Sequence, residues 1–323
     1  MDTALCGIAA ILVAGATACA RPVNGATVLR GSALRVLPKE SVALLVMDVR
    51  SLRDLESVSR WMKEMAAAAE QQGTFRQVKD RIGLETVKRL DRLGLAIVPQ
   101  ADGRLAYGLL AEGSFGQAKL REALGGQETL TFVEAEGKPD LSATILAGGN
   151  LAIGPKSVLE VLRTNASRGA GGIDGNDLLM GVLAGVRPQA QIWGAIDCRS
   201  LARLARESAL TQGAVEKALA GAPIASSLVS LSFQTTLGKP AAFDLQGRAD
   251  AEDNARKMAD AARGLVALGR MGASQDKGRE WLEFLDGIAI EQKGADLSLR
   301  GTLSEGLLAS FAAKAHDGST ARP

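Results

Sequence analysis

The chain has 323 residues, of which 46% are hydrophobic and only 3% aromatic, and this length suits two units of ordinary domain size. Its 38 Lys and Arg residues nearly balance its 36 Asp and Glu residues, so the charge offers no basic excess to neutralise phosphates. Together with the shortage of aromatic side chains for base stacking, this balance argues against nucleic acid as a partner.

Residues 1–19 have the features of an export leader. The apolar run Leu5–Ala18 is shorter than the roughly 20 residues needed to cross a bilayer, but it fits the apolar region of a signal peptide. It ends at Ala16-Thr17-Ala18-Cys19, which resembles a bacterial lipobox, where the Cys after the cut is lipid-modified. We therefore expect an exported protein, in the periplasm or at the outer membrane, anchored by a lipid on Cys19. A soluble secreted protein and a retained N-terminal helix remain alternatives.

Residues 20–35 follow as a linker, and a first α+β unit is predicted over residues 36–164. It opens with the short apolar run 42–47, which is typical of a central strand covered on both faces. From Leu52 the apolar side chains recur every three or four residues, which predicts an amphipathic helix on the sheet. The remaining expected elements are a hairpin of strands 93–98 and 104–111, a helix over 114–124, strands 130–136, 141–147 and 151–153, and a helix over 156–163.

Residues 165–185 predict a linker that is rich in Gly at first and ends in a short apolar helix over 178–183. A second α+β unit over 186–314 then repeats the order of the first, and residues 315–323 are expected to form a disordered tail. The expected elements of the second unit are a strand over 192–196, helices over 201–210 and 215–219, a hairpin of strands 229–234 and 243–246, a helix over 250–265, a hairpin of strands 288–290 and 297–299, and a helix over 305–314.

A repeated motif relates the two halves. Pro38 and Asp48-Val49-Arg50-Ser51-Leu52 return as Pro188 and Asp197-Cys198-Arg199-Ser200-Leu201. Each half contains the β-α-β-β-α-β order of a split βαβ unit with an added strand. The predicted fold is therefore α+β, a tandem duplication of a ferredoxin-like unit with mostly antiparallel sheets, helices packed on one face, and the two sheets paired as a pseudo-dimer.

The same motif supplies the candidate site. Asp48 and Asp197 each lie where a predicted strand becomes a helix, so in a two-fold arrangement they could face one another as an acid pair, with Arg50 and Arg199 beside them. The alternative is structural: a short acidic side chain just before a helix accepts backbone N–H bonds, and Ser51 or Ser200 assists. The structural alternative is the stronger.

Other reactive residues offer little chemistry. Cys198 is the one cysteine outside the leader, so we predict neither an internal disulfide nor a structural zinc site, and a small buried apolar role for its side chain. His316, the single histidine, falls in the tail, which removes most Ser-His-Asp schemes. No Gly-rich loop has the spacing of a phosphate-binding motif.

We expect the three tryptophans in the core, namely Trp61, Trp193 and Trp281. We predict no cofactor, no metal and no enzyme activity, while catalysis by paired carboxylates stays formally open.

The segment Leu37-Pro38-Lys39-Glu40-Ser41, with the apolar strand and Asp48 that follow it, resembles the start of bacterial exported proteins or lipoproteins of unknown function. The resemblance implies export and no active site. We therefore expect a non-catalytic envelope protein that binds or scaffolds a protein partner or a second copy of itself. A periplasmic carrier of an apolar ligand, held between sheet and helices, is the alternative.

Overall fold

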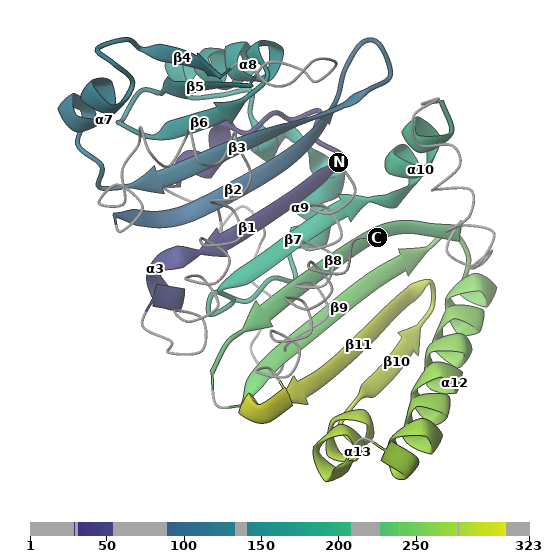
Figure 1. Cartoon of the computed structure of the whole chain (residues 1–323). Coiled ribbons are helices and arrows are strands. Elements are labelled where there is room, and N and C mark those ends of the chain that lie inside the picture. The colour runs from purple at the N-terminus through teal and green to yellow at the C-terminus, as the bar shows by residue number, and fades with distance from the viewer. Residues whose placement is uncertain are drawn as a thin grey trace, which may run out of the picture. The chain divides into compact units, whose positions relative to one another are not determined.

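The computed structural model describes residues 29, 32–53, 89–132, 141–207, 227–238, 240–276 and 278–307. Among these residues, eleven strands form one antiparallel sheet with the order β10-β11-β9-β8-β7-β1-β2-β3-β6-β5-β4 (Figure 1). Helices accompany the sheet, so the predicted α+β class and its mostly antiparallel pairing are confirmed.

The chain divides into two units, which we describe one at a time. Of the described residues, the first unit comprises those within Val23–Gly185 and Gly194–Gln212, and the second comprises those within Val186–Trp193 and Gly213–Pro323. Strand β7 (Ile192–Asp197) therefore begins in the second unit and ends in the first.

In the first unit the strands are neighbours in the order β1-β2-β3-β6-β5-β4. The hairpin between β2 and β3 turns where the sequence predicts it, with Gly103 at a φ of 78° and the Gln100 N–H donating to the Arg104 carbonyl at 2.8 Å. The elements of this unit are η1 (Ala33–Val36), β1 (Ala43–Asp48), α3 (Val49–Arg53), β2 (Leu90–Pro99), β3 (Leu105–Gly113), α7 (Gln117–Ala123), β4 (Thr129–Phe132), β5 (Leu141–Ile145), β6 (Leu151–Gly154), α8 (Lys156–Arg168), η2 (Ile173–Gly175), α9 (Asp177–Leu183) and α10 (Cys198–Glu207).

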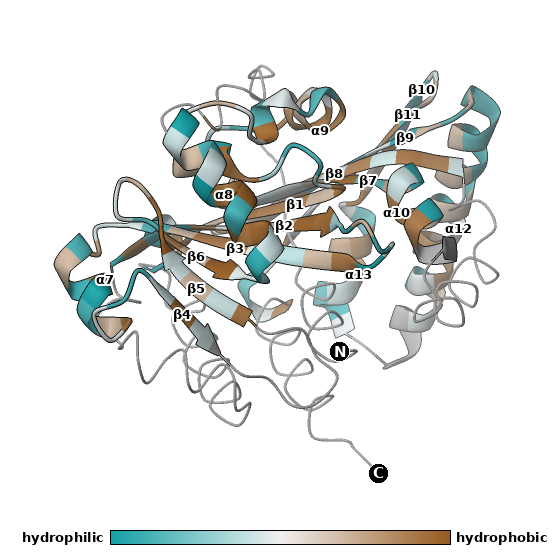
Figure 2. Cartoon of the chain, turned by 90° about the horizontal axis from the view of Figure 1, so that it is seen from above, coloured by the Kyte–Doolittle hydropathy of each residue, from teal (hydrophilic) through white to brown (hydrophobic). Residues whose placement is uncertain are grey.

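Helices lie on both faces of the first unit's sheet, whereas the sequence predicts them on one. On one face α8 lies over β3 and β6 (Figure 2). The row Gly94, Leu110 and Ala152 crosses β2, β3 and β6 on this face, and Val158 of α8 lies 2.8 Å from where a Cβ on Gly108 would stand. The other face carries Ala111 and Leu151, which pack in one cluster with the buried Phe115, Leu120 of α7 and Leu124. The reason is that these strands alternate small and large apolar residues and so present two apolar faces, each of which must be covered.

The strand order also differs from that of a ferredoxin-like unit. In a split βαβ unit, the two strands joined by the first helix are parallel and a third strand separates them. Here β1 and β2 are direct antiparallel neighbours, with Leu45 opposite Leu95. Within the described residues, strands lie near the predicted positions, but the neighbours of β1 are not those of the predicted topology, because hydrophobic periodicity specifies an element's type and not the strand beside it. The helices predicted from Leu52, over 215–219 and over 305–314 lie wholly or mostly outside the described residues.

The second unit places β8 (Leu228–Thr236), β9 (Ala241–Ala249), β11 (Asp296–Leu303) and β10 (Ala289–Lys293) side by side, with β8 next to β9 and β10 at the edge. Helices α12 (Glu252–Asp276) and α13 (Gly278–Asp286) pack against this sheet (Figure 1). Its apolar core contains Phe243, Phe284 and Trp281, and the Trp281 and Phe284 rings meet edge to face at 5.6 Å.

The two units match in strand order and in register. The order β1-β2-β3-β6-β5 of the first corresponds to β7-β8-β9-β11-β10 of the second. The β2–β3 pairing slips between Leu90 and Arg92, and the β8–β9 pairing slips at the corresponding place, between Leu228 and Ser230. Counting from these slips, the apolar row Gly94, Leu110 and Ala152 of the first unit corresponds to the polar row Ser232, Gln246 and Ser298 of the second.

Candidate functional site

The two repeated aspartates cap helices. Asp48 ends β1 and accepts a hydrogen bond from the Ser51 N–H at 3.0 Å, and Asp197 ends β7 and accepts one from the Ser200 N–H, also at 3.0 Å. The Ser51 hydroxyl returns a bond to the Asp48 carbonyl at 3.1 Å. A carboxylate that accepts from the third residue of a following helix satisfies one of the free N–H groups at its start. The structural interpretation of the repeated motif therefore describes both sites.

The same aspartates do not face one another. The Asp197 N–H donates to the Val42 carbonyl at 2.7 Å, so Asp197 lies beside the residue that precedes β1. Asp48 lies at the other end of β1, about 20 Å away at the usual rise of a strand. Arg50 and Arg199 are both exposed, one near each end of this strand pair. The structure thus separates the four residues of the proposed symmetric site into two distant caps.

Cys198 follows Asp197 and is half-buried at the start of α10. Burial, with a smaller contribution from the neighbouring Asp197 carboxylate, raises the pKa of the Cys198 thiol to about 11. Both effects disfavour the thiolate, which is the reactive form of cysteine. Cys198 is therefore protonated at neutral pH and unsuited to act as a nucleophile.

A buried ion-pair network that the sequence did not reveal lies in the second unit, around Asp244 of β9. The Asp244 side chain is only 1% exposed, and its Oδ2 lies 3.0 Å from Arg187 Nη2 and 3.5 Å from Arg300 Nε. Amide groups supply the remaining contacts: Gln234 Nε2 lies 3.3 Å from Oδ2, and Gln246 Nε2 lies 3.3 Å from Oδ1. Every carboxylate oxygen of Asp244 is thus occupied by a donor of this chain.

This network joins the segment before β7 to three strands. Asp244 stands opposite Gln234 on β8 and opposite Arg300 on β11 in the strand register, and the Arg187 N–H also donates to Gln234 Oε1 at 2.7 Å. A buried carboxylate held by two guanidinium groups is a fixed anchor, because breaking one pair leaves an uncompensated charge. In the sequence, the network could be recognised only from the alternation of Phe243 and Leu245 with Asp244 and Gln246. This alternation indicates that one face of the strand is polar, but it does not show that this polar face is buried.

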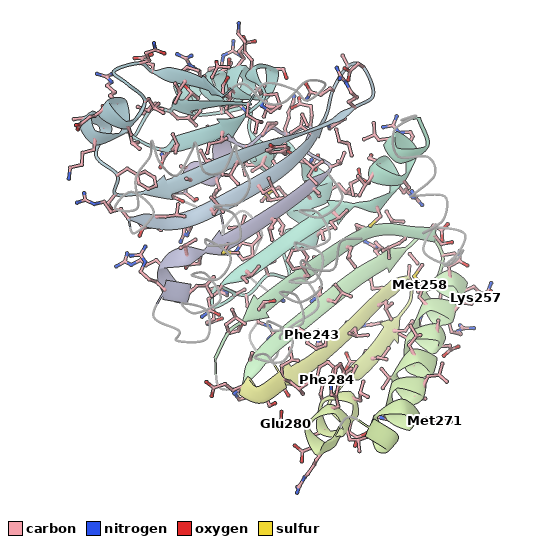
Figure 3. The ribbon with its side chains drawn as sticks, viewed as in Figure 1. Phe243, Lys257, Met258, Met271, Glu280 and Phe284 are labelled. Carbon is pink, nitrogen blue, oxygen red and sulfur yellow. The ribbon has the colours of Figure 1, made fainter. Side chains whose placement is uncertain are left out.

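An exposed apolar stripe runs along α12. Its large side chains are among the most exposed hydrophobic ones in the described residues: Leu265 at 70%, Leu268 at 64% and Met271 at 68%. Ala261 and Gly264, also exposed, lie among them, and we call these five residues the α12 stripe. The opposite side of the helix buries Ala255 and Ala259, and Figure 3 shows Met258 toward the strands and Met271 on the outer side.

The remaining predicted residues have these positions. Trp193 is buried at 4% exposure, as predicted for a core residue, and Trp281 packs on Phe284. Cys19, Trp61 and His316 lie outside the described residues. Within the described part of the chain, no group of three or more His, Cys, Asp or Glu side chains is placed to hold a metal ion. None of the helices there combines the length and the hydrophobicity of a membrane span.

Comparison of the chain with protein-family models, with curated proteins and with solved structures finds no significant match. Arguments about function therefore start from the residues described above. Among these, the carboxylates of the two caps and of Asp244 are bonded within the chain, while the large side chains of the α12 stripe are 64–70% exposed among the described residues. The stripe is the candidate functional site.

Proposed function

We propose that the protein is a non-catalytic exported protein of the bacterial envelope, anchored through a lipid on Cys19, that serves as a binding or scaffolding module for protein partners. The α12 stripe carries this proposal. Single exposed apolar side chains are ordinary, but a contiguous row of large ones on a well-packed helix is typical of an interaction surface. Burying each Leu or Met side chain contributes about 1.5–3 kcal/mol, so the stripe offers a partner a useful share of its binding free energy.

The bonding of the ionisable groups supports a non-catalytic role. Asp48 and Asp197 use a carboxylate oxygen to cap a helix, and Asp244 is surrounded by Arg and Gln donors. Cys198 keeps its proton at neutral pH because of its raised pKa. An enzyme acid, base or nucleophile must instead exchange protons or bonds with a substrate. These groups are engaged in holding the fold.

We infer that the two units arose by duplication of a gene segment that encoded a single α+β unit. The shared strand order, the register slip at matching positions and the identical 3.0 Å caps of Asp48 and Asp197 support descent of the two units from one α+β unit. Independent halves would have little reason to repeat an irregularity at the same place, because such slips are specific features of a strand pair. The doubled unit is an antiparallel one in which the first two strands are direct neighbours.

Photo-cross-linking in a bacterial host tests the binding role. A photo-reactive phenylalanine analogue at Leu268 is expected to give discrete protein adducts, because that side chain lies in the stripe. The same analogue at Arg263, which is exposed on α12 beside Asp260, is the matched control and is expected to give none. Absence of protein adducts from Leu268, or equal adducts from both positions, would refute the binding role.

The anchor requires its own measurement. Mass spectrometry of the mature protein is expected to show a diacyl or triacyl adduct on Cys19. An unmodified chain that begins at Cys19 or Ala20 would exclude the lipid anchor while leaving export intact. A chain that retains residues 1–18 in the cytoplasm would exclude export as well.

A further inference from the structure

We propose that α12 docks against α12 of a second copy of this chain through the stripe, in antiparallel orientation, about a two-fold axis at the level of residue 266 along the helix. This inference rests on the proposed function, because it names the protein partner of the same stripe. Its first support is the spacing of the stripe. Ala261, Gly264, Leu268 and Met271 follow one another at intervals of three, four and three residues, the heptad spacing of a helix that packs along one seam.

The second support is that the seam is complementary to itself. In an antiparallel pair centred on residue 266, Ala261 of one copy meets Met271 of the other, and Gly264 meets Leu268. Each layer then combines one small and one large residue, the arrangement that lets facing side chains interdigitate. The three large side chains are 64–70% exposed, so they are available for this contact.

The third support is a glycine that the described residues of one copy do not explain. None of them lies within 4 Å of where a Cβ on Gly264 would stand, so none of them requires Gly at this position. Gly in a helix interior destabilises the helix by about 0.8–1.0 kcal/mol relative to Ala. A close approach from outside, as by Leu268 of a second copy, gives this glycine a packing role. By contrast, a Cβ on Gly269 would lie 3.3 Å from Leu285, an explanation within the chain.

The arginine side chains of α12 permit this contact. Arg256, Arg263 and Arg270 repeat every seven residues, and each has an acidic partner of its own chain. The pairs are Arg256 with Glu252 at 3.2 Å, Arg263 with Asp260 at 2.8 Å and Arg270 with Asp286 at 2.8 Å. Because each of these arginines is paired within its own copy, the arginines add no net like-charge repulsion between two copies.

The size of the seam sets the expected affinity. Residues 261–271 cover about three helical turns. Two copies would bury on the order of 1,000 Å² in total, which is the lower limit for a specific interface and less than the usual 1,600 Å². We therefore expect a reversible dimer with a dissociation constant in the micromolar range.

Sedimentation equilibrium of the full exported chain tests the dimer, with Cys19→Ala so that no lipid adds mass. The unsubstituted helix is expected to give a monomer–dimer equilibrium, and Leu268→Glu is expected to raise the dissociation constant about tenfold or more. Val161→Glu is the matched control, because Val161 is an exposed apolar residue on α8 and the chemical change is the same. A monomer at all concentrations, or equal effects of the two substitutions, would overturn the inference.

A swap of residues tests the pairing itself. Gly264→Leu alone places two large residues in one layer and is expected to weaken the dimer, although it favours the helix. Leu268→Gly alone removes the contact. The double variant Gly264→Leu, Leu268→Gly restores one large and one small residue in each layer and is expected to recover most of the association. A double variant weaker than both single variants contradicts this register.

Disulfide formation tests the orientation. A mixture of Ala261→Cys and Met271→Cys proteins is expected to cross-link, while either protein alone is not, since residues 261 of the two copies would lie about 15 Å apart along the axis. Cross-linking of each protein with itself would indicate a parallel pair and overturn the inference. If the chain is monomeric but Leu268 still cross-links to another protein, this inference fails and the proposed function stands. If Leu268 forms no protein adduct, both fail.

Discussion

Phe243 of β9 lies over Gly301, its direct partner on β11, and fills the space that a side chain there would need. A Cβ on Gly301 would stand 2.7 Å from Phe243 Cε1, and the Phe243 ring is in turn 6.2 Å from that of Phe284 on α13 (Figure 3). The pair links the sheet of the second unit to its helical layer. A glycine in this strand is therefore a packing requirement.

Replacement of Gly301 is expected to destabilise the protein. Gly301→Ala forces the Phe243 ring from its place, and overpacking of this kind lowers the free energy of unfolding by about 1–3 kcal/mol. Urea unfolding measures the effect. The matched control is Gly181→Ala in α9, where a Cβ would meet nothing within 4 Å and the helix gains stability from Ala. Equal effects of the two substitutions would contradict the packing role of Gly301.

Removal of either capping carboxylate is expected to lower stability with no other consequence. Asp48→Ala and Asp197→Ala should each reduce the free energy of unfolding by about 0.5–2 kcal/mol, whereas Asn at either position should retain most of it, because Asn caps a helix as well as Asp does. Thermal and urea unfolding provide the measurement. Unchanged stability together with lost partner binding would favour a functional role for these aspartates instead.

The Asp244 network is expected to be far more sensitive. Asp244→Ala leaves Arg187 and Arg300 without their buried partner, and breaking a buried pair in this way reduces the free energy of unfolding by about 3–5 kcal/mol. Asp253→Ala removes an exposed carboxylate 3.5 Å from Arg256 and is expected to change stability by less than about 1 kcal/mol. A small effect at Asp244 would show that water or a rearranged side chain replaces its bonds.

Alkylation of Cys198 is expected to be slow in the folded protein. With the pKa of the thiol raised from 9.0 to about 11, the thiolate fraction at pH 8 is about a hundredfold smaller than in the unfolded chain. The rate of iodoacetamide labelling at Cys198, followed by peptide mass spectrometry, should rise about tenfold per pH unit until the pH approaches 11. Labelling at pH 8 as fast as in urea would contradict the raised pKa.

The sequence predicted individual strands and turns better than it predicted which strands lie side by side in the sheet. The run 42–47 and the turn at Gly103 correspond to β1 and the β2–β3 hairpin, because apolar runs and glycine turns are local signals. The capping of α3 by Asp48 was likewise foreseen from residues adjacent in the chain. The strand order was not, since the choice of β2 as the neighbour of β1 depends on how the chain returns.

The candidate site escaped prediction for a similar reason. Leu265, Leu268 and Met271 continue a helical pattern, and their apolar character alone suggests a buried face; only the packing of Ala255 and Ala259 shows which side meets the sheet. For Asp244 the error is the reverse, because the sequence suggests exposure and the structure shows burial. Its alternation with Phe243 and Leu245 suggests a solvent-facing side chain, and its burial depends on Arg187, 57 positions earlier.

The matched rows Gly94, Leu110 and Ala152 in one unit and Ser232, Gln246 and Ser298 in the other bear on how a chain with two similar halves avoids misfolding. Tandem copies are prone to exchange strands, because each copy can accept the other's segments. Here a β8 exchanged into the place of β2 would bring Ser232 to the position of Gly94, beneath Leu34 and Leu37, and would bury its hydroxyl group among apolar side chains. The difference between the two faces therefore disfavours the exchange of strands between the two units.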